Sequence, residues 1–520
     1  MSSLLGRNAV PSTGEAREIR SSLRCCHAEI VAVDADIVRT WDKFQELRQR
    51  REVLKKHVDQ LDALVSPARR LYPELVAAIF THCLTHDTEL PDPYPHKIRV
   101  SPLSLSQICS GWRGVALSTP QLWSSIPITF DPSLMNAVEI IQRRVRMLHS
   151  WLERSGSLPI TADIRRCDKS WASSSEWQTE GRQLVAELLP YSQQWTDLTF
   201  HLPNSCLSPL WEAMGTPLPQ LTRLTVVDED PAGRWRIFSG RGWSVPAIKH
   251  VAEIQHLSLT LPLLNLRSYD IRWCQLSSLS LMAGYSHNQS LLNLDSAASV
   301  LRECTNVVTC HLSIGGGGTF HAAPVVTPRL KNLDLVISGV GLRDLLRVLS
   351  APQLEELRIN EGWNVAAVAS FLAGLHRPLR CFSIRRIYGI SGEELLQCLQ
   401  QAPSLVSLSI SSCVSDEVIH ALTSSDANTI YHLCPRLTSL DIRVPDDCDE
   451  TQLGNMIESR CVINSDNAGV STLKSVHVDF QSRELPSETL TCCFDHLKAN
   501  GLVITYNQVD RWDWDSEFGW

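Results

Sequence analysis

The 520-residue sequence contains no run of apolar residues that approaches the roughly 18 needed to cross a membrane. Its beginning, MSSLLGRNAVPSTGE, also lacks the apolar core of roughly 7–15 residues that marks a signal peptide. Both absences argue against a secreted or membrane-inserted protein. We therefore expect a cytoplasmic or nuclear protein that does not act at a membrane.

Signatures of catalytic and metal-binding sites are also absent. The 17 cysteines include no Cys-x-x-Cys pair, and the 17 histidines show no metal-ligand spacing. Neither Gly-x-Ser-x-Gly nor His-Glu-x-x-His occurs, and no phosphate-binding loop with its lysine is present. We therefore expect no enzymatic activity, no metal and no cofactor, and reduced cysteines that are buried or half-buried.

The overall composition is that of a folded protein, with 43% hydrophobic and 20% charged residues. The net charge is −8, which argues against nucleic acid as the main partner because phosphate binding requires a basic surface. The interactions of this chain are therefore expected to be with proteins.

Residues 17–65 follow a heptad pattern, preceded by a tail over 1–16 that we expect to be disordered. Two polar residues, Thr40 and Arg51, interrupt the apolar seam, and the stretch between Arg17 and Ser66 contains neither proline nor glycine. The pattern predicts one long helix of the coiled-coil type, roughly 70 Å in length. The apolar positions are Ile19, Leu23, Cys26, Ile30, Val33, Ile37, Phe44, Leu47, Leu54, Val58, Leu61 and Val65.

A single helix with an exposed apolar seam is unfavourable in water unless another protein surface packs against the seam. Either it associates with a second copy or another protein, or it folds back on its own chain. Arg51 disfavours a parallel dimer, because two cations would then meet in one layer of the seam. The helix is expected to end at Ser66-Pro67, because proline restricts the residue before it.

Residues 66–128 predict a small helical module with more apolar residues than it can bury alone. LYPELVAAIF at 71–80 places apolar side chains on one helical face, with Pro73 in the first turn. A proline-rich loop follows at 85–97, and SQICSGWRGVALSTPQLW at 106–123 forms the second part. Part of the apolar surface of the module is therefore expected to bind a partner protein.

These segments resemble the F-box, whose pattern has Leu-Pro-x-Glu-Ile/Leu, then Val/Ile-Cys-x-x-Trp-Arg, then Thr-Pro-x-Leu-Trp. Three clusters match in order: Leu71, Pro73, Glu74 and Leu75; Ile108, Cys109, Trp112 and Arg113; Thr119, Pro120, Leu122 and Trp123. The chain most resembles the mushroom-type (basidiomycete) fungal F-box proteins, which also carry a heptad helix ending in Ser-Pro. It departs from the pattern at Tyr72 and in the length of the proline-rich loop.

The resemblance implies docking on the Skp-family adaptor of a cullin-based SCF ubiquitin ligase. The residues that it implies for the adaptor contact are Leu71, Pro73, Glu74, Leu75, Ile79, Phe80, Leu84, Leu105, Ile108, Trp112, Leu122 and Trp123. A helical cap on the following repeats, without a partner, is the structural alternative for this module.

Residues 196–505 repeat an irregular Leu-x-x-Leu-x-Leu unit, often opened by a proline, as in Pro352-Gln353-Leu354. Successive units start roughly 22 to 36 residues apart, which is the spacing of leucine-rich repeats with insertions. We expect strands at 198–200, 221–226, 254–259, 276–281, 307–312, 330–335, 354–359, 379–384, 405–410, 437–442 and 473–478. Residues 129–195 are expected to form a connecting helix and an N-terminal cap that contains LPITADI at 158–164.

The predicted fold is therefore an α/β leucine-rich-repeat solenoid with an all-α N-terminal part. Side chains between the leucines would face the concave side of the sheet, where a target protein would bind. Candidates for that contact are His311, Asn332, Asp334, Glu356, Arg358, Arg385, Asp441, Arg443 and His477. The tail at 506–520 is acidic and aromatic, and either forms a docking peptide or folds onto the last repeat.

These features predict the substrate-recognition subunit of an SCF-type ubiquitin ligase. In that role the F-box holds the adaptor, the repeats hold an unknown target protein, and other subunits bring the ubiquitin-charged enzyme. The alternative is a leucine-rich-repeat interaction scaffold outside any ubiquitin ligase. Copurification of the adaptor would distinguish the two.

Overall fold

The computed structural model describes residues 10–83, 101–131, 136–166, 177–228, 248, 253–261, 266, 271–283, 292–315, 320, 323–387, 389–423, 433–445, 448–461, 471–481 and 486–509. The chain divides into two units, residues 1–82 and 83–520. Leu84, most of the predicted tail over 1–16 and all of the tail beyond Val509 lie outside the described residues.

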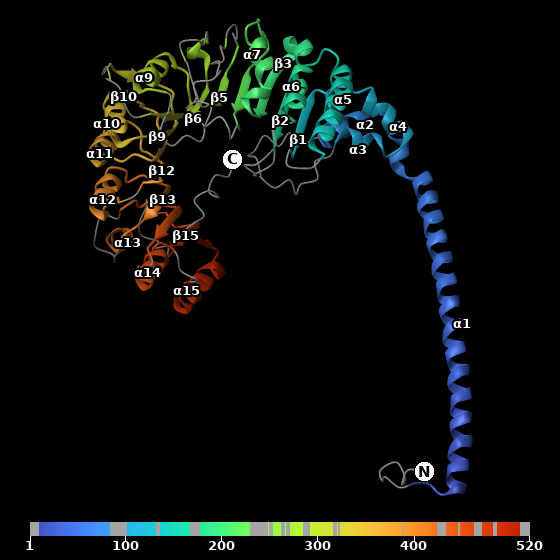
Figure 1. Ribbon diagram of the computed structural model, residues 1–520. Helices are drawn as coiled ribbons and strands as arrows, with labels where there is room; N and C mark the ends of the chain where they lie inside the picture. Colours follow the sequence, from blue (N-terminus) through green and yellow to red (C-terminus); the bar gives the residue numbers. More distant parts are fainter. Residues whose placement is uncertain are drawn as a thin grey trace. The chain divides into compact units, whose positions relative to one another are not determined.

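The first unit is dominated by α1 (Thr13–Val65), which is followed by the 3-10 turn η1 (Pro67–Arg70) and α2 (Pro73–Cys83) (Figure 1). A capping box closes the start of α1, because Ser12 Oγ accepts from the Glu15 amide while Glu15 Oε2 accepts from the Ser12 amide. The predicted start at residue 17 is therefore four residues late, since the cap at Ser12 overrides the weak propensity of Gly14. The predicted end at Ser66-Pro67 is confirmed.

In the described residues, the second unit contains a parallel sheet of fourteen strands arranged in chain order, and a separate two-stranded pair. The strands of the large sheet are β1 (Ser125–Phe130), β2 (Ile160–Arg166), β3 (Trp195–His201), β4 (Arg223–Val227), β5 (His256–Leu261), β6 (Ser278–Ala283), β7 (Thr309–Ile314), β9 (Asn332–Ile337), β11 (Glu356–Asn360), β12 (Cys381–Arg385), β13 (Ser407–Cys413), β14 (Ser439–Val444), β15 (Ser475–Gln481) and β16 (Val503–Val509). The separate pair is β8 (Val325–Val326) with β10 (Leu349–Ser350).

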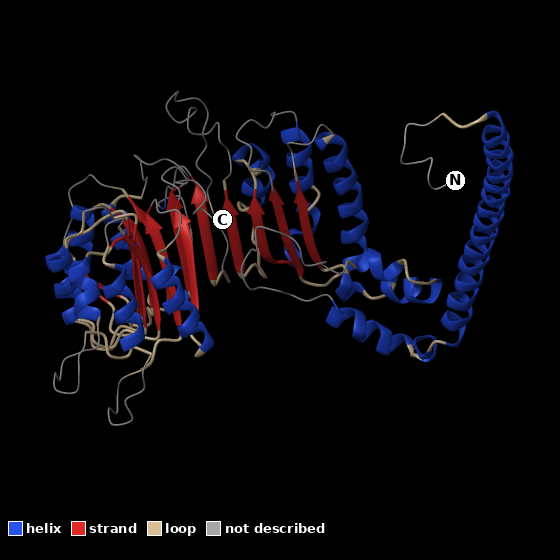
Figure 2. Cartoon of the chain, turned by 90° about the horizontal axis from the view of Figure 1, so that it is seen from below, coloured by secondary structure: helices blue, strands red, loops and turns tan. Residues whose placement is uncertain are grey.

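The helices and short 3-10 turns of the second unit either precede the first strand or connect successive strands. They are α3 (Pro102–Ser106), α4 (Ser110–Leu117), η2 (Pro120–Leu122), α5 (Ala137–Ser155), α6 (Gln178–Ala186), η4 (Leu189–Gln194), η5 (Asn204–Cys206), α7 (Ser208–Ala213), η7 (Trp273–Gln275), α9 (Leu294–Glu303), α10 (Gly339–Val348), α11 (Val365–Ala373), α12 (Gly392–Gln400), α13 (Asp416–Leu422), α14 (Glu450–Ser459) and α15 (Glu488–Ala499). Figures 1 and 2 show α5 and the helices that follow it on one face of the sheet, with the strands lining the inner, concave side of the second unit.

The alternation within each strand explains this layering. In β9 the side chains of Leu333, Leu335 and Ile337 are buried, whereas those of Asn332 and Asp334 are partly exposed. Because successive side chains of a strand point to opposite faces, one face packs on the helices and the other remains free. The apolar core thus lies between the sheet and the helix layer, where α10, for example, buries Leu342, Leu345 and Leu346.

Every segment predicted as a Leu-x-x-Leu-x-Leu strand between 198 and 478 contains a strand of the sheet, and the solenoid-like series is confirmed. The sheet nevertheless begins earlier than predicted. Its first strand, β1, starts inside the segment assigned to the helical module, and LPITADI continues into β2, a fully paired strand. It also ends later, at Val509, because Tyr506 to Val509 extend the last strand.

In the described residues no helix combines the length with the apolar character that a membrane span requires.

Candidate partner-binding surfaces

Helix α2 has one buried and one exposed apolar face. Val76 and Phe80 lie one turn apart and are buried, at 3% and 1% exposure. Leu75 and Ile79, also one turn apart, are 51% and 45% exposed, and Leu71 just before the helix is 37% exposed. Apolar side chains at this spacing form a continuous stripe on a helix. The exposed stripe is therefore a candidate surface for a protein partner.

The Cys-x-x-Trp-Arg cluster forms the corner between α3 and α4. The Cys109 Sγ accepts from the Trp112 amide at 3.4 Å and caps α4, while Arg113 Nε donates to the Ser106 carbonyl at 2.9 Å. These bonds satisfy backbone groups that a short helix leaves without partners. They leave Ile108 56% exposed at the corner, and Leu117 41% exposed at the end of α4.

The Thr-Pro-x-Leu-Trp cluster has a structural role. Thr119 Oγ1 donates to the Val115 carbonyl at 2.7 Å, and Pro120 occupies the first turn of η2, where no amide is needed. Leu122 and Trp123 are buried at 1% and 0% exposure. This cluster joins α4 to the start of the sheet.

The predicted adaptor contacts are therefore corrected in part. Phe80, Leu105, Leu122 and Trp123 are buried, and a side chain in the core cannot also present itself to a partner. Pro73, Glu74, Leu71, Leu75, Ile79 and Ile108 are exposed, and Trp112 is half-buried. Tyr72, at 72% exposure, and Leu117 are exposed apolar residues that we did not predict. For Tyr72, its position between the predicted Leu71 and Pro73 was the available signal.

The second candidate surface is the helix-free face of the sheet. Its middle row of side chains is set by the strand register, which pairs His311 with Asp334, Asp334 with Arg358, and Asp441 with His477. The predicted residues Asn332 and Glu356 lie in the neighbouring row, and Arg385 and Arg443 lie in the row beyond. All nine predicted concave-face residues therefore lie on this face, on strands β7 to β15.

Polar and charged side chains pair along the middle strands of this face. Asp334 accepts a hydrogen bond from Asn360 Nδ2 at 2.6 Å, and its other carboxylate oxygen lies 3.4 Å from His311 Nδ1. Arg358 Nε donates to Glu356 Oε1 at 2.7 Å. These partly exposed pairs contribute little to stability, so they remain available for exchange with the charges of a partner.

A second polar cluster occupies β13 to β16. Asp479 Oδ1 lies 2.9 Å from His477 Nε2, and Asp479 Oδ2 lies 3.7 Å from Arg443 Nη2. His477 Nδ1 lies 2.7 Å from Thr505 Oγ1, and Ser409 Oγ donates to Asp441 Oδ2 at 2.8 Å. The predicted Arg443 and His477 thus both contact Asp479, whereas the predicted Asp441 pairs with Ser409 on the neighbouring strand.

A third cluster, near the N-terminal end of the sheet, was not predicted as a site. Arg223 Nε lies 3.2 Å from Asp197 Oδ2. Burial raises the pKa of Asp197 despite the attraction of Arg223. Burial, followed by the charge of Arg223, lowers the pKa of His256. The cluster is therefore partly desolvated at the surface of the sheet.

Neither surface carries a metal-binding arrangement, since the described ranges contain no group of three or more His, Cys, Asp or Glu placed to hold a metal ion. The cysteines that the structure describes are all free thiols. Burial raises the pKa of Cys304 and of Cys398 to about 12, which keeps these thiols protonated and unreactive.

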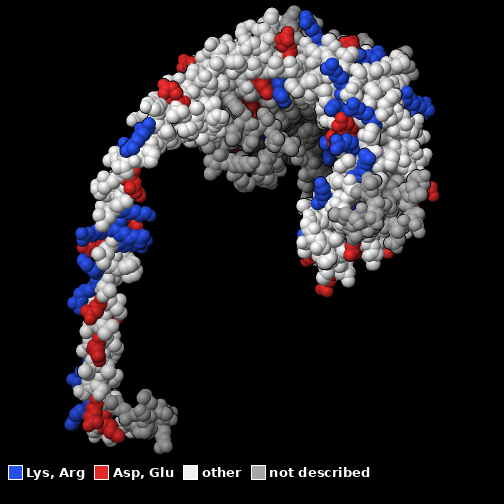
Figure 3. All heavy atoms as spheres, turned by 180° about the vertical axis from the view of Figure 1, so that it is seen from behind, with Lys and Arg blue, Asp and Glu red and all other residues white. Residues whose placement is uncertain are grey.

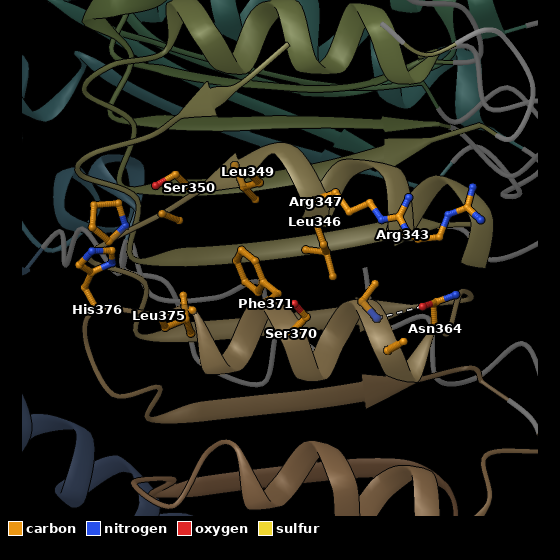
Figure 4. A pocket seen from close by; sticks show the side chains of 15 residues that line it. Arg343, Leu346, Arg347, Leu349, Ser350, Asn364, Ser370, Phe371, Leu375 and His376 are labelled. Atoms are coloured by element: carbon orange, nitrogen blue, oxygen red, sulfur yellow. Dashed lines mark hydrogen bonds between the residues drawn. The ribbon is translucent and has the colours of Figure 1, made fainter. Parts of the chain in front are cut away.

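A cavity of about 510 Å³ lies on the helix side, lined by α10, α11 and adjoining residues (Figure 4). Arg343, Arg347 and His376 line it together with the apolar Leu346 and Phe371. The Asn364 Oδ1 that faces it already accepts from the Ala367 amide at 3.0 Å, as the N-cap of α11. The lining mixes apolar side chains with separate polar ones, and we rank the cavity below the two surfaces as a candidate site.

Comparisons with known proteins add little. No protein-family profile matches the chain, and no curated protein matches it either. Among solved structures the chain is similar to the crystal structure of the Rad7 and Elc1 complex in yeast, at 13% sequence identity and a TM-score of 0.31. That similarity covers 87% of this chain and 97% of the other. A similarity at this level does not establish a shared fold or function.

Proposed function

We propose that this protein is the substrate-recognition subunit of an SCF-type ubiquitin ligase. In this proposal residues 66–128 are an F-box that docks on a Skp-family adaptor. The sheet and its helices are leucine-rich repeats, and their helix-free face binds the target protein. The observation that most supports this proposal is the exposed apolar stripe of Leu71, Leu75 and Ile79. It lies on α2 and just before it, and the other apolar face of α2 is already buried.

Two features support the F-box assignment beside that stripe. The three motif clusters occur in the order of the F-box pattern, and the residues of the second and third cluster make the local bonds of a small helical module. Ile108 and Leu117 provide a further exposed apolar surface on that module. In this proposal both surfaces are needed for the adaptor, and each is tested by its own variant.

The helix-free face supports the target-binding role. Its side chains are polar and of mixed sign, and they are held in rows by the parallel register rather than by loops. Rows of this kind suit the recognition of a protein of complementary charge. The catalytic chemistry would come from the cullin-based ligase, because bringing two reactants together can lower a barrier by roughly 7–11 kcal/mol in favourable cases.

The test is a binding titration between the full chain and a purified Skp-family adaptor. A fragment of residues 66–128 is unsuitable, because β1 pairs with β2 and Trp123 packs on Trp151. We expect Leu75→Asp to weaken binding by about 2 kcal/mol or more, as truncation of a binding hot spot does. Ile108→Asp should weaken it through the second surface.

Val340→Asp is the matched control, since Val340 is an equally apolar side chain, 65% exposed on α10. Its affinity for the adaptor should equal that of the unmodified chain. If the folded chain does not bind the adaptor, or binds it equally well with Leu75→Asp, the F-box assignment fails. The interaction scaffold outside any ubiquitin ligase would then be the function that remains.

A further inference from the structure

The apolar seam of α1 is uncovered along its whole length. Its larger side chains are 49% to 72% exposed, and no described side chain of the helix is buried. The exposed seam residues are Leu23, Ile30, Val33, Ile37, Phe44, Leu47, Leu54, Val58, Leu61 and Val65. A helix of 53 residues with such a seam is stable in water mainly as one strand of a coiled coil.

Between Glu29 and Lys55 the charges beside the seam divide by sign along the helix. Glu29, Asp34 and Asp36 flank it in the N-terminal half, whereas Arg48, Arg50 and Lys55 flank it in the C-terminal half. Figure 3 shows basic side chains gathered in one stretch of α1. These flanking positions are the ones that pair between the strands of a coiled coil, so they decide which partner and which orientation fit.

A parallel dimer of this helix is unfavourable. In register, Glu29 would face Asp34 of the second copy, and Arg50 would face Lys55. Two Arg51 side chains would also share one layer of the seam. Each of these contacts occurs between like charges, and the first two occur twice by symmetry.

An antiparallel dimer reverses these signs. With the two seams fully overlapped, Asp36 faces Arg50 of the second copy, and Asp34 faces Arg48. Arg51 then lies in a layer with Val33, beside the acidic residues instead of another cation. Every such contact occurs twice, because a two-fold interface uses the same surface on both copies.

The same overlap fills the seam from end to end. Ile19 lies opposite Val65, Leu23 opposite Leu61, and Ile30 opposite Leu54. The remaining layers are Ile37 with Leu47, Thr40 with Phe44, Val33 with Arg51, and Cys26 with Val58. Any shift by one heptad would leave two seam residues of each copy uncovered, for example Leu61 and Val65. The full overlap is therefore the arrangement that buries the most apolar surface.

One contact of this dimer is unfavourable, since Lys43 faces Lys43 of the second copy. Glu46 offsets it, because its carboxylate lies 2.7 Å from the Lys43 ammonium on the same helix. Asp36 pairs with Arg39 within the single helix, but both side chains are more than two-thirds exposed. A pair of that exposure is weak, and it exchanges for the contact with Arg50 at little cost.

We propose that α1 binds α1 of a second copy of this chain, as an antiparallel two-stranded coiled coil that overlaps from Ile19 to Val65. The partner is a second copy because the order of charges along α1 is complementary to itself when the helix is reversed. The C-terminal ends of the two helices then lie about 70 Å apart, at opposite ends of the rod. The dimer thus carries two copies of residues 66–520, one from each end.

The experiment is sedimentation equilibrium of the full chain and of four charge or seam variants. Arg50→Glu discriminates between orientations, because it places two acids together in the antiparallel dimer but creates an attraction to Lys55 in the parallel one. We expect its dimer dissociation constant to rise about tenfold, because the two exposed pairs of Asp36 with Arg50 would change from attraction to repulsion. Combining it with Asp36→Lys exchanges the charges and should restore the original dissociation constant. Ile37→Lys should abolish the dimer.

Lys56→Glu is the matched control, since it makes the same charge change in the same stretch but on the outer side of the helix, and it should leave the dissociation constant unchanged. Circular dichroism on every variant verifies that the helix and the sheet are retained. A chain that remains monomeric at about 100 µM, well above the dissociation constant of a stable long coiled coil, would overturn the proposal. A dimer that Arg50→Glu tightens would overturn it too, because it would be parallel.

Discussion

The indole N–H of Trp123 donates a hydrogen bond of 2.8 Å to the carbonyl of Ala116, the last buried residue of α4. The ring of Trp123 also meets that of Trp151 edge to face, with centroids 5.1 Å apart, and carries the Arg154 guanidinium 4.7 Å from its centroid. Trp123 therefore ties the helical module to α5, the first long helix of the repeat unit. Its role is structural, although its place in the motif suggested a partner contact.

We accordingly expect Trp123→Ala to act on stability. Removing a fully buried tryptophan and its hydrogen bond should lower the free energy of unfolding by about 3–5 kcal/mol. Denaturant unfolding followed by circular dichroism measures this. Leu117→Ala, in the exposed part of α4, is the control and should cost less than about 1 kcal/mol. An unfolding curve of Trp123→Ala that matches the unmodified chain would contradict this role.

Arg460 is a buried cation of the sheet unit, at 7% exposure. Its guanidinium donates to the carbonyls of Leu422, Leu433 and Cys434, the last at 3.0 Å. Burial lowers its pKa, but the carbonyls satisfy its donors. We expect Arg460→Met to lower the free energy of unfolding by about 2–4 kcal/mol, because three buried carbonyls lose their partner.

The control for this prediction is Arg436→Met. Arg436 is exposed two residues after Cys434, so its replacement should change the free energy of unfolding by less than about 0.5 kcal/mol. Equal effects of the two substitutions would show that Arg460 does not hold this part of the chain together.

The cysteines should differ sharply in reactivity in the folded protein. Burial raises the pKa of Cys434 to about 11, and that of Cys304 to about 12. Because the thiolate is the form that reacts, both should resist iodoacetamide at about pH 8, whereas the exposed Cys274 and Cys492 should be alkylated. Mass spectrometry of native and denatured samples gives the extent at each position. Rapid native alkylation of Cys434 would be inconsistent with its burial.

His256 should make the sheet unit sensitive to mild acid. Burial and the charge of Arg223 lower its pKa, so the unfolded chain binds a proton at a pH where the folded chain does not. The free energy of unfolding should therefore fall as the pH drops below about 6.5. In His256→Gln this part of the decrease should disappear. Denaturant midpoints at about pH 7.5 and 5.5 provide the comparison. An unchanged pH dependence in the variant would contradict the shift.

The strand series was readable in the sequence because each strand repeats the same local rule. A residue pattern of period two, opened by a turn, places Leu333 and Leu335 on one face and Asp334 on the other wherever the strand is paired. The concave-face candidates followed from that rule alone. Likewise the heptad pattern located α1, because one unbroken helix needs no information from the rest of the chain.

The module at 66–128 was predicted less well, for a physical reason. An amphipathic pattern shows that a side chain is apolar and on a given face, but it does not show which neighbour covers that face. Phe80 and Ile79 are adjacent in the sequence and equally apolar, yet one is buried and the other is 45% exposed. From the sequence alone, Trp123 could equally be a docking anchor or a core residue. Its contact with Trp151 in the tertiary structure shows that it belongs to the core.

The sequence alone thus determined the long helix, the repeated strands and the face on which each strand residue lies, since these depend on local periodicity. Only the tertiary structure decided which apolar residues are core, where the sheet begins and ends, and which charges form networks such as that of Asp479, Arg443 and His477. Those properties depend on distances between segments far apart in the chain, and such distances are set by packing.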